Sequence, residues 1–189
     1  MKVIVCSIIA AFLSGVLVAW ALNSKQGGIA DIAFVDHNQE TFTLAAFRDK
    51  HVILNFMFNG CSPVQTVGLR RVFLDHELDA KPKNIVFVSI SIAPETDTPA
   101  QLKRFAQRYK IDAAQWRFGI TDRQNLDRLL ETFNAGIAID GDPNAHLNTV
   151  FHLDPSGEIA KVYTGFPINP DEVYNDLAGS LKLSSSLSF

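Results

Sequence analysis

Apolar and polar positions follow each other along the chain in a way that is typical of a sheet covered by helices. Two near-continuous apolar runs, 51–58 and 84–92, are rich in β-branched residues and predict strands that are buried on both faces. After each run, apolar side chains recur at helical spacing, along 63–78 and along 99–109. This order predicts two consecutive strand-to-helix units.

The flanking stretches carry shorter signals of the same kind. Residues 33–35 and 42–44 enclose a turn-forming segment and predict a hairpin at a sheet edge, and a third strand is expected at 116–120. Capping patterns predict further helices after Thr121 and after Asn169. Residues 149–153 and 159–163 flank an Asp-Pro-Ser-Gly turn and predict a second hairpin.

The order of these elements predicts an α/β fold with a thioredoxin-like mixed central sheet and helices on both faces. Two strand-to-helix units are followed by a hairpin and a last helix. The domain is expected to span 29–183. A short polar linker, 23–28, precedes it, and a Ser-rich tail, 184–189, follows it. Residues 134–148 contain Gly and Pro without periodicity and predict an irregular loop.

The N-terminal segment 1–22 predicts export of the domain. Val3 to Leu22 is a run of 20 uncharged, mostly apolar residues, long enough to cross a bilayer as a helix. Ala19-Trp20-Ala21 also fits the small-x-small pattern of a signal-peptide cleavage site. We therefore expect either a retained membrane anchor or a cleaved signal, with the domain on the outer, periplasmic side in both cases.

Charge argues against nucleic acid as a partner. The chain has 17 Lys and Arg against 20 Asp and Glu, and the basic residues are scattered. No basic stripe is therefore available to contact a phosphate backbone.

Cysteine usage is sparse. The chain has two cysteines, and Cys6 lies in the apolar run, so Cys61 is the one thiol of the folded part. An internal disulfide cannot form there, although export places the domain in an oxidising compartment. Cys61 is either a reactive group or a buried structural thiol.

The predicted fold brings candidate chemistry to the turn between the first buried strand and its helix. Cys61 lies at this turn, where the helix dipole favours a thiolate, the form that attacks electrophiles and binds metals. His146, at the end of the irregular loop, could supply a second soft-metal ligand or a base. The alternative is a buried cysteine with an unrelated surface histidine.

Three segments resemble the Sco/SenC family of copper-assembly proteins. They are VILNFMFNGCSPVQTVGL (52–69), VSISIAPETDTPAQLKRFAQRY (88–109) and HLNTVFHLDPSGEIAKVYTG (146–165). The resemblance spans about 29–181. Its most distinctive parts are the Pro-Glu-x-Asp-Thr-Pro run at 94–99 and a His, His146, that is followed after eight residues by Pro and then Gly.

This resemblance implies a metal site. Family members hold copper with a CxxxC motif and a distant histidine, and help to assemble cytochrome oxidase or act as thiol reductants. Cys61 matches the first cysteine and His146 the histidine, but Gln65 stands where the second cysteine belongs. Ser62 and Ala93 also depart from the common Pro and Asp of the family.

The Gln65 substitution limits what such a site can do. A neutral amide oxygen is a poor replacement for a thiolate toward Cu(I), so copper binding should be weak or lost. Gln65 and Met57 remain weak additional ligand candidates, and Met57 in an apolar strand is more typical of core packing. Intramolecular dithiol-disulfide cycling is excluded, because it needs a second sulfur.

Three functional hypotheses follow. The first is an assembly factor, rather than an enzyme, with a reduced copper role through Cys61 and His146 and with an oxidase subunit or another copper-assembly protein as partner. The second is a single-cysteine protein in which peroxide oxidises Cys61 and an external thiol resolves it. The third is a degenerate member that acts only as a protein-binding module.

Overall fold

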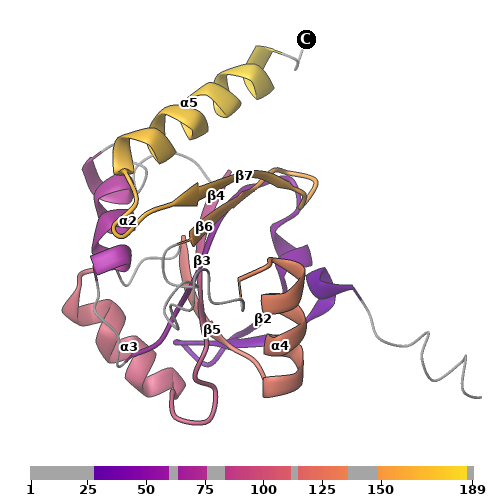
Figure 1. Cartoon of the computed structure of the whole chain (residues 1–189), viewed down its shortest axis with the longest axis vertical. Helices are drawn as coiled ribbons and strands as arrows, with labels where there is room; N and C mark the ends of the chain where they lie inside the picture. The colour runs from indigo at the N-terminus through magenta and orange to yellow at the C-terminus, as the bar shows by residue number, and fades with distance from the viewer. Residues whose placement is uncertain (1–27, 60–63, 76–83, 112–114, 136–148, 187–189) are drawn as a thin grey trace, which may run out of the picture.

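A single seven-stranded sheet organises the chain in the computed structural model, which describes residues 28–59, 64–75, 84–111, 115–135 and 149–186 (Figure 1). The strands are β1 (Phe34–Asp36), β2 (Thr41–Phe42), β3 (His51–Met57), β4 (Ile85–Ser91), β5 (Trp116–Ile120), β6 (Thr149–Leu153) and β7 (Ile159–Thr164). The helices are α2 (Val64–Asp75), α3 (Pro99–Arg108), α4 (Arg123–Thr132) and α5 (Pro170–Ser186), with short 3-10 turns η1 (Ile29–Asp31) and η2 (Leu44–Phe47).

The sheet is mixed and β3 lies inside it. Its order is β2-β1-β5-β4-β3-β6-β7; β3 pairs in parallel with β4 and antiparallel with β6. β4 and β5 are also parallel, whereas both terminal hairpins are antiparallel. All seven residues of β3 and all seven of β4 are buried. The predicted thioredoxin-like mixed sheet is thus confirmed.

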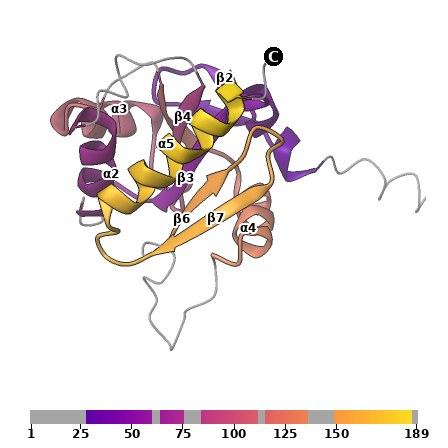
Figure 2. The same ribbon diagram turned by 90° about the horizontal axis from the view of Figure 1, so that it is seen from above.

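Alternation along the strands divides the core into two layers. Ile53 and Met57 of β3 face one side, where they pack with apolar residues of α2, α3 and α5. Val52, Leu54 and Phe56 face the other side, together with α4, η1 and η2. Figures 1 and 2 show α2, α3 and α5 on the opposite side of the sheet from α4. Helices therefore cover both faces, as predicted.

Local sequence signals place most of these boundaries. Thr98 caps α3 in a complete capping box with Gln101, and the Asp122 carboxylate accepts the Asn125 N–H at the start of α4. The predicted strand 116–120 is β5 without change. Helix α5 continues through Ser186, so it reaches into the segment 184–189 expected to be a tail.

The N-terminal predictions lie outside the described residues, which begin at Gly28. The anchor or signal over 1–22, and nearly all of the linker over 23–28, therefore stay predictions. Within the described ranges, no helix combines the length and the apolar character that a membrane span requires.

A buried polar chain crosses the three parallel strands. The Ser89 hydroxyl donates to Asn55 Oδ1 at 2.7 Å and accepts from the Trp116 indole N–H at 3.0 Å. All three side chains are buried. Because a one-residue slip of β3, β4 or β5 would leave these groups unpaired, the contacts favour a single strand register.

Two buried histidines meet between β3 and β6. His51 Nδ1 and His152 Nε2 are 2.9 Å apart, so one ring donates and the other accepts. Burial lowers the pKa of both imidazoles below 6.5, that of His152 to about 4, and the neighbouring His51 ring adds to the lowering of the His152 pKa. The Asp154 and Asp176 carboxylates act in the opposite direction on His152, while Lys161 adds to the lowering.

This pair predicts a loss of stability in mild acid. Unfolded histidines bind protons as the pH falls through 6.5, whereas the folded pair resists protonation, so the unfolded state gains protons first. From the pKa of about 4 for His152, we expect a loss of about 2 kcal/mol in unfolding free energy between pH 7 and pH 5. Urea denaturation at both pH values measures it.

The double variant His51→Phe/His152→Phe is the control, because it removes both imidazoles and keeps aromatic rings in the sheet. Its unfolding free energy should change much less between pH 7 and pH 5. An equal loss in the native chain and in this variant would assign the acid sensitivity to other groups.

Candidate functional site

The site expected from the sequence lies where β3 gives way to α2. β3 ends at Met57 and α2 begins at Val64. Cys61 and His146 both lie outside the described residues, within 60–63 and 136–148. Their proximity therefore stays a prediction, and the structure shows instead how the surrounding chain is held.

A buried carboxylate holds the chain as it leaves β3. Asp97 Oδ2 accepts the Asn59 N–H at 3.2 Å and the Ser91 hydroxyl at 2.6 Å, and the Asp97 residue is 7% exposed. The Ile92 N–H adds a bond to the Met57 carbonyl at 2.8 Å. The backbone is thus fixed up to two residues before Cys61.

The turn that carries Asp97 is itself well bonded. The Ala93 carbonyl accepts the N–H groups of Thr96 and Asp97 at 3.0 and 2.8 Å. The Ala93 N–H donates to the Ser91 hydroxyl at 3.1 Å. Thr98 then starts α3 with its capping box. Much of the Pro-Glu-x-Asp-Thr-Pro run thereby forms a rigid connection between β4 and α3.

Arg123 ties this turn to α4. Its guanidinium makes two bonds to the Glu95 carboxylate, at 2.7 and 2.6 Å, and a longer one to the Ile92 carbonyl at 3.4 Å. The Arg123 guanidinium lowers the pKa of Glu95. An exposed pair of this kind adds little stability, but its two-pronged geometry orients both side chains.

Gln65 occupies the first turn of α2 and points into the protein. It is 4% exposed, and its Oε1 accepts the buried Ile168 N–H at 3.0 Å. Ile168 follows the cis peptide bond between Phe166 and Pro167, in the connection from β7 to α5. Gln65 Nε2 is buried and has no hydrogen-bond partner among the described residues. The side chain at the position of the missing cysteine thus links α2 to this connection.

Met57, the other weak ligand candidate, is part of the core. It is 4% exposed and belongs to the apolar layer that contains Leu69 and Val72 of α2. This environment fits the packing role that the apolar strand indicated. The described residues contain no cluster of three or more His, Cys, Asp or Glu side chains placed to hold a metal ion.

An apolar surface adjoins the first turns of α2. Val64, Val67 and Phe166 are 38%, 36% and 46% exposed. A shallow cavity of about 280 Å³ lies here, and its lining residues are Val64, Val67, Gly68, Arg71, Pro167, Ile168 and Pro170. The link between Gln65 and Ile168 therefore also joins the two walls of this cavity.

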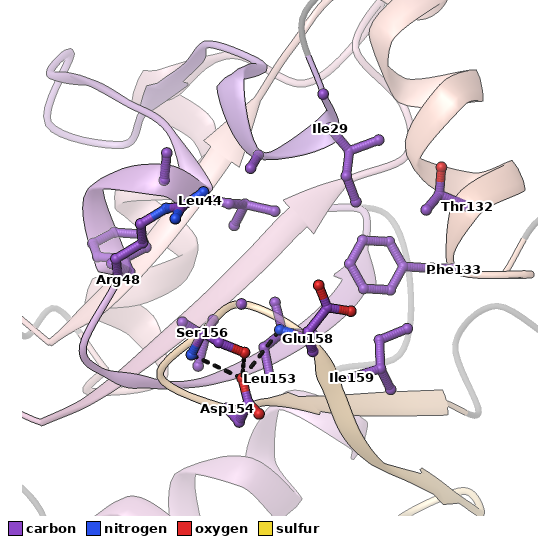
Figure 3. Close-up of a pocket in the computed structure, with 16 residues that line it drawn as sticks. Ile29, Leu44, Arg48, Thr132, Phe133, Leu153, Asp154, Ser156, Glu158 and Ile159 are labelled. Atoms are coloured by element: carbon purple, nitrogen blue, oxygen red, sulfur yellow. Dashed lines mark hydrogen bonds between the residues drawn. The ribbon is translucent and has the colours of Figure 1, made fainter.

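A second cavity, of about 340 Å³, lies at the opposite end of β3, beside Val52 (Figure 3). Ile29, Phe133 and Leu153 contribute apolar walls. The Asp154 carboxylate at its edge accepts bonds from the hydroxyl and N–H of Ser156 and from the Glu158 N–H, within its own turn. This cavity is therefore separate from the carboxyl end of β3.

Sequence reasoning missed the contacts of Asp97, Arg123 and Gln65. The Pro-Glu-x-Asp-Thr-Pro run was a signal for Asp97, because an acidic residue just before a helix cap is available for a specific contact. No local signal marks Ile168 as the partner of Gln65, since the two residues are 103 positions apart.

Comparison with known proteins gives a consistent result. A SCO1/SenC family model matches residues 23–182. A SCO1 protein homolog of Bacillus subtilis is 24% identical over 164 residues, which cover 84% of this chain and 83% of that protein.

Solved structures share the fold. BsSco, a member of the Sco family of cytochrome c oxidase assembly proteins, aligns with a TM-score of 0.64 and 22% identity over 79% of this chain and 90% of its own. Yeast Sco1 with copper bound aligns with a TM-score of 0.59 and 14% identity, over 80% and 90% of the two chains. On the family match, which covers most of its length, the chain belongs to the SCO1/SenC family.

Proposed function

We propose that this chain is an exported or membrane-tethered Sco-type assembly factor whose copper site is reduced to one thiolate, Cys61, and one imidazole, His146. The observation that carries the proposal is the environment of Gln65. At the position of the family's second cysteine, this side chain is buried and bonded to the Ile168 amide.

The side chains that are available as ligands determine how the chain could bind copper. Cu(I) prefers sulfur and then imidazole, so a cysteine and a histidine remain suitable ligands. Gln65 Oε1 already accepts the Ile168 N–H, and using it for a metal would leave a buried amide unpaired. The proposed site therefore has two strong donors, and its affinity for copper is lower than that of a site with two thiolates.

The N-terminal segment supports the proposed location. The apolar run from Val3 to Leu22 would export the domain and, if it is retained, hold it at the outer side of the membrane. The proposed partner is a respiratory oxidase subunit or another copper-assembly protein, which would receive or supply the metal in that compartment.

A second candidate function is protein binding without copper. The exposed side chains of Val64 and Val67 favour it, because they line a mostly apolar cavity beside the first turns of α2. In this case Gln65 preserves the shape of a former metal site. The two functions differ in whether the native chain binds copper at all.

Copper titration of the full chain separates them. The protein carries Cys6→Ser, so that Cys61 is the one thiol, and is titrated anaerobically with Cu(I) against a competing chelator. We expect one Cu(I) per chain, with affinity lowered roughly tenfold or more in Cys61→Ala and in His146→Ala, because each removes one donor. Gln65→Cys should raise the affinity roughly a hundredfold by adding a thiolate.

The copper affinities of the native chain and of its variants distinguish the two functions. Binding that is unchanged in both Cys61→Ala and His146→Ala would exclude the proposed site. Absence of binding by the native chain, together with tight binding by Gln65→Cys, would favour the protein-binding function.

Gln65 also has a predicted effect on stability. In Gln65→Met, which keeps much of the side-chain volume, the Ile168 N–H loses its acceptor inside the protein. We expect the unfolding free energy to fall by about 1–2 kcal/mol, measured by urea denaturation. Gln107→Met, on the exposed face of α3, is the matched control and should change it by less than about 0.5 kcal/mol. Equal small effects in both variants would contradict a structural role for Gln65.

A further inference from the structure

The cavity of about 340 Å³ beside Val52, which we call the amino-end cavity, is within the size range of small-ligand sites. Its walls are mainly apolar. Leu44 contributes from η2, Phe133 from the C-terminal cap of α4 and Ile159 from the start of β7 (Figure 3). Ile159 is 44% exposed, so the cavity opens to the surface along an apolar wall. This shape and lining fit an apolar ligand better than a polar one.

Charged side chains at the amino-end cavity do not favour an ionic ligand. Arg48, Asp154 and Glu158 line it, one cation against two carboxylates. The Asp154 carboxylate already accepts three bonds within its own turn. An anion would therefore meet more negative than positive charge, and the described residues contain no cluster of side chains placed to hold a metal ion. The lining favours an uncharged hydrocarbon chain.

The amino-end cavity also lies where the N-terminal segment joins the domain. Gly28 and Ile29 are among its lining residues. The apolar run that is predicted to cross a bilayer ends at Leu22, six residue steps before Gly28. Even a fully extended chain of this length reaches at most about 20 Å. A retained anchor would therefore hold the amino-end cavity close to the bilayer surface.

The size of the domain makes this attachment directional. A domain of this length is roughly 40 Å across, about twice the reach of the linker. Val52 lies near the amino end of β3 and Asn59 follows its carboxyl end, and seven strand residues separate the two ends by roughly 20 Å. Attachment at Gly28 therefore favours orientations in which the amino end of β3 faces the bilayer and the carboxyl end faces away.

We propose that the amino-end cavity is a membrane-docking site, which takes a lipid acyl chain while the domain rests on the outer surface of the bilayer. The exposed wall at Ile159 and the apolar side chains beside it provide the contact, which buries hydrocarbon rather than pairing charges. The carboxyl end of β3 then faces away from the membrane, where a soluble domain of a partner can reach it. This docking depends on the proposed function in one respect, the retention of 1–22 as an anchor.

Quenching of a fluorophore by spin-labelled lipid tests the docking. The full chain, with Cys6→Ser and Cys61→Ser and with 1–22 verified by mass spectrometry, is reconstituted in phosphatidylcholine vesicles that contain doxyl-labelled acyl chains. Bimane is attached through Ser156→Cys, at the cavity, or through Ala100→Cys, at an exposed position in the first turn of α3.

The two fluorophores should differ strongly. We expect about half of the fluorescence or more to be quenched at Ser156 and less than about a tenth at Ala100, because a docked surface enters the boundary between headgroups and acyl chains. About 0.5 M NaCl should leave this difference in place, since the contact is not ionic.

A matched pair of variants identifies the cavity as the docking surface. Ile159→Asp places a charge in the apolar wall and should lower the quenching at Ser156 by about threefold or more, because an unpaired carboxylate is costly to bury in hydrocarbon. Val35→Asp is the control, since Val35 is a strand residue that is 42% exposed and does not line this cavity. It should leave the quenching nearly unchanged. If Ile159→Asp does not fold by circular dichroism, Ile159→Ser replaces it.

Four results would overturn the proposal: equal quenching at Ser156 and Ala100, loss of the difference in high salt, an equal loss in Ile159→Asp and Val35→Asp, or shielding of the Ser156 fluorophore from both the doxyl lipid and aqueous iodide. The last result would assign the cavity to a segment of protein instead of a lipid. Removal of 1–22 from the purified chain would overturn the anchor and the docking together. No readout involves copper, so the outcome is independent of whether the native chain binds the metal.

Discussion

Strand β3 is the constraint on which the rest of the structure depends. It is buried along its whole length, with β4 and β6 bonded to its two edges and helices packed on both of its faces. Polar groups in such a strand need partners inside the protein. His51 meets His152 at one end, and the Asn55 side-chain oxygen Oδ1 accepts a hydrogen bond from the Ser89 hydroxyl in the middle. Beyond its carboxyl end, Asn59 meets Asp97, so the chain enters the segment with Cys61 from a fixed point.

The most consequential difference from the family pattern is at Gln65. A cysteine at this position would supply a ligand, whereas the glutamine supplies an acceptor to the Ile168 amide. Among the described residues its Nε2 has no hydrogen-bond partner, so the bond accepted by Oε1 is the polar contact that they show for this side chain. The side chain thereby holds α2 against the connection between β7 and α5. The thiol chemistry that remains involves one sulfur.

Local sequence patterns predict the helices and strands of this fold well, because strand burial and helix capping depend on residues that are close together in the sequence. The two β-branched runs form β3 and β4 in the structure. The capping residues Thr98 and Asp122 stand at the starts of α3 and α4. Contacts between distant segments were not predictable in the same way. The pairing of His51 with His152 depends on the register of β6 against β3, and that of Gln65 with Ile168 on the packing of α2 against the connection between β7 and α5. The proximity of Cys61 and His146, expected from the predicted fold and from the family resemblance, stays a prediction.

An assembly factor with one thiolate and one imidazole differs chemically from one with two thiolates, and the ligands of copper distinguish them directly. X-ray absorption spectroscopy at the copper edge, on the full Cys6→Ser chain loaded with one equivalent of Cu(I), counts the sulfur atoms around the metal. We expect a single sulfur neighbour, with the remaining neighbours being nitrogen or oxygen. Two sulfur neighbours, or none, would contradict a copper site built from Cys61 and His146.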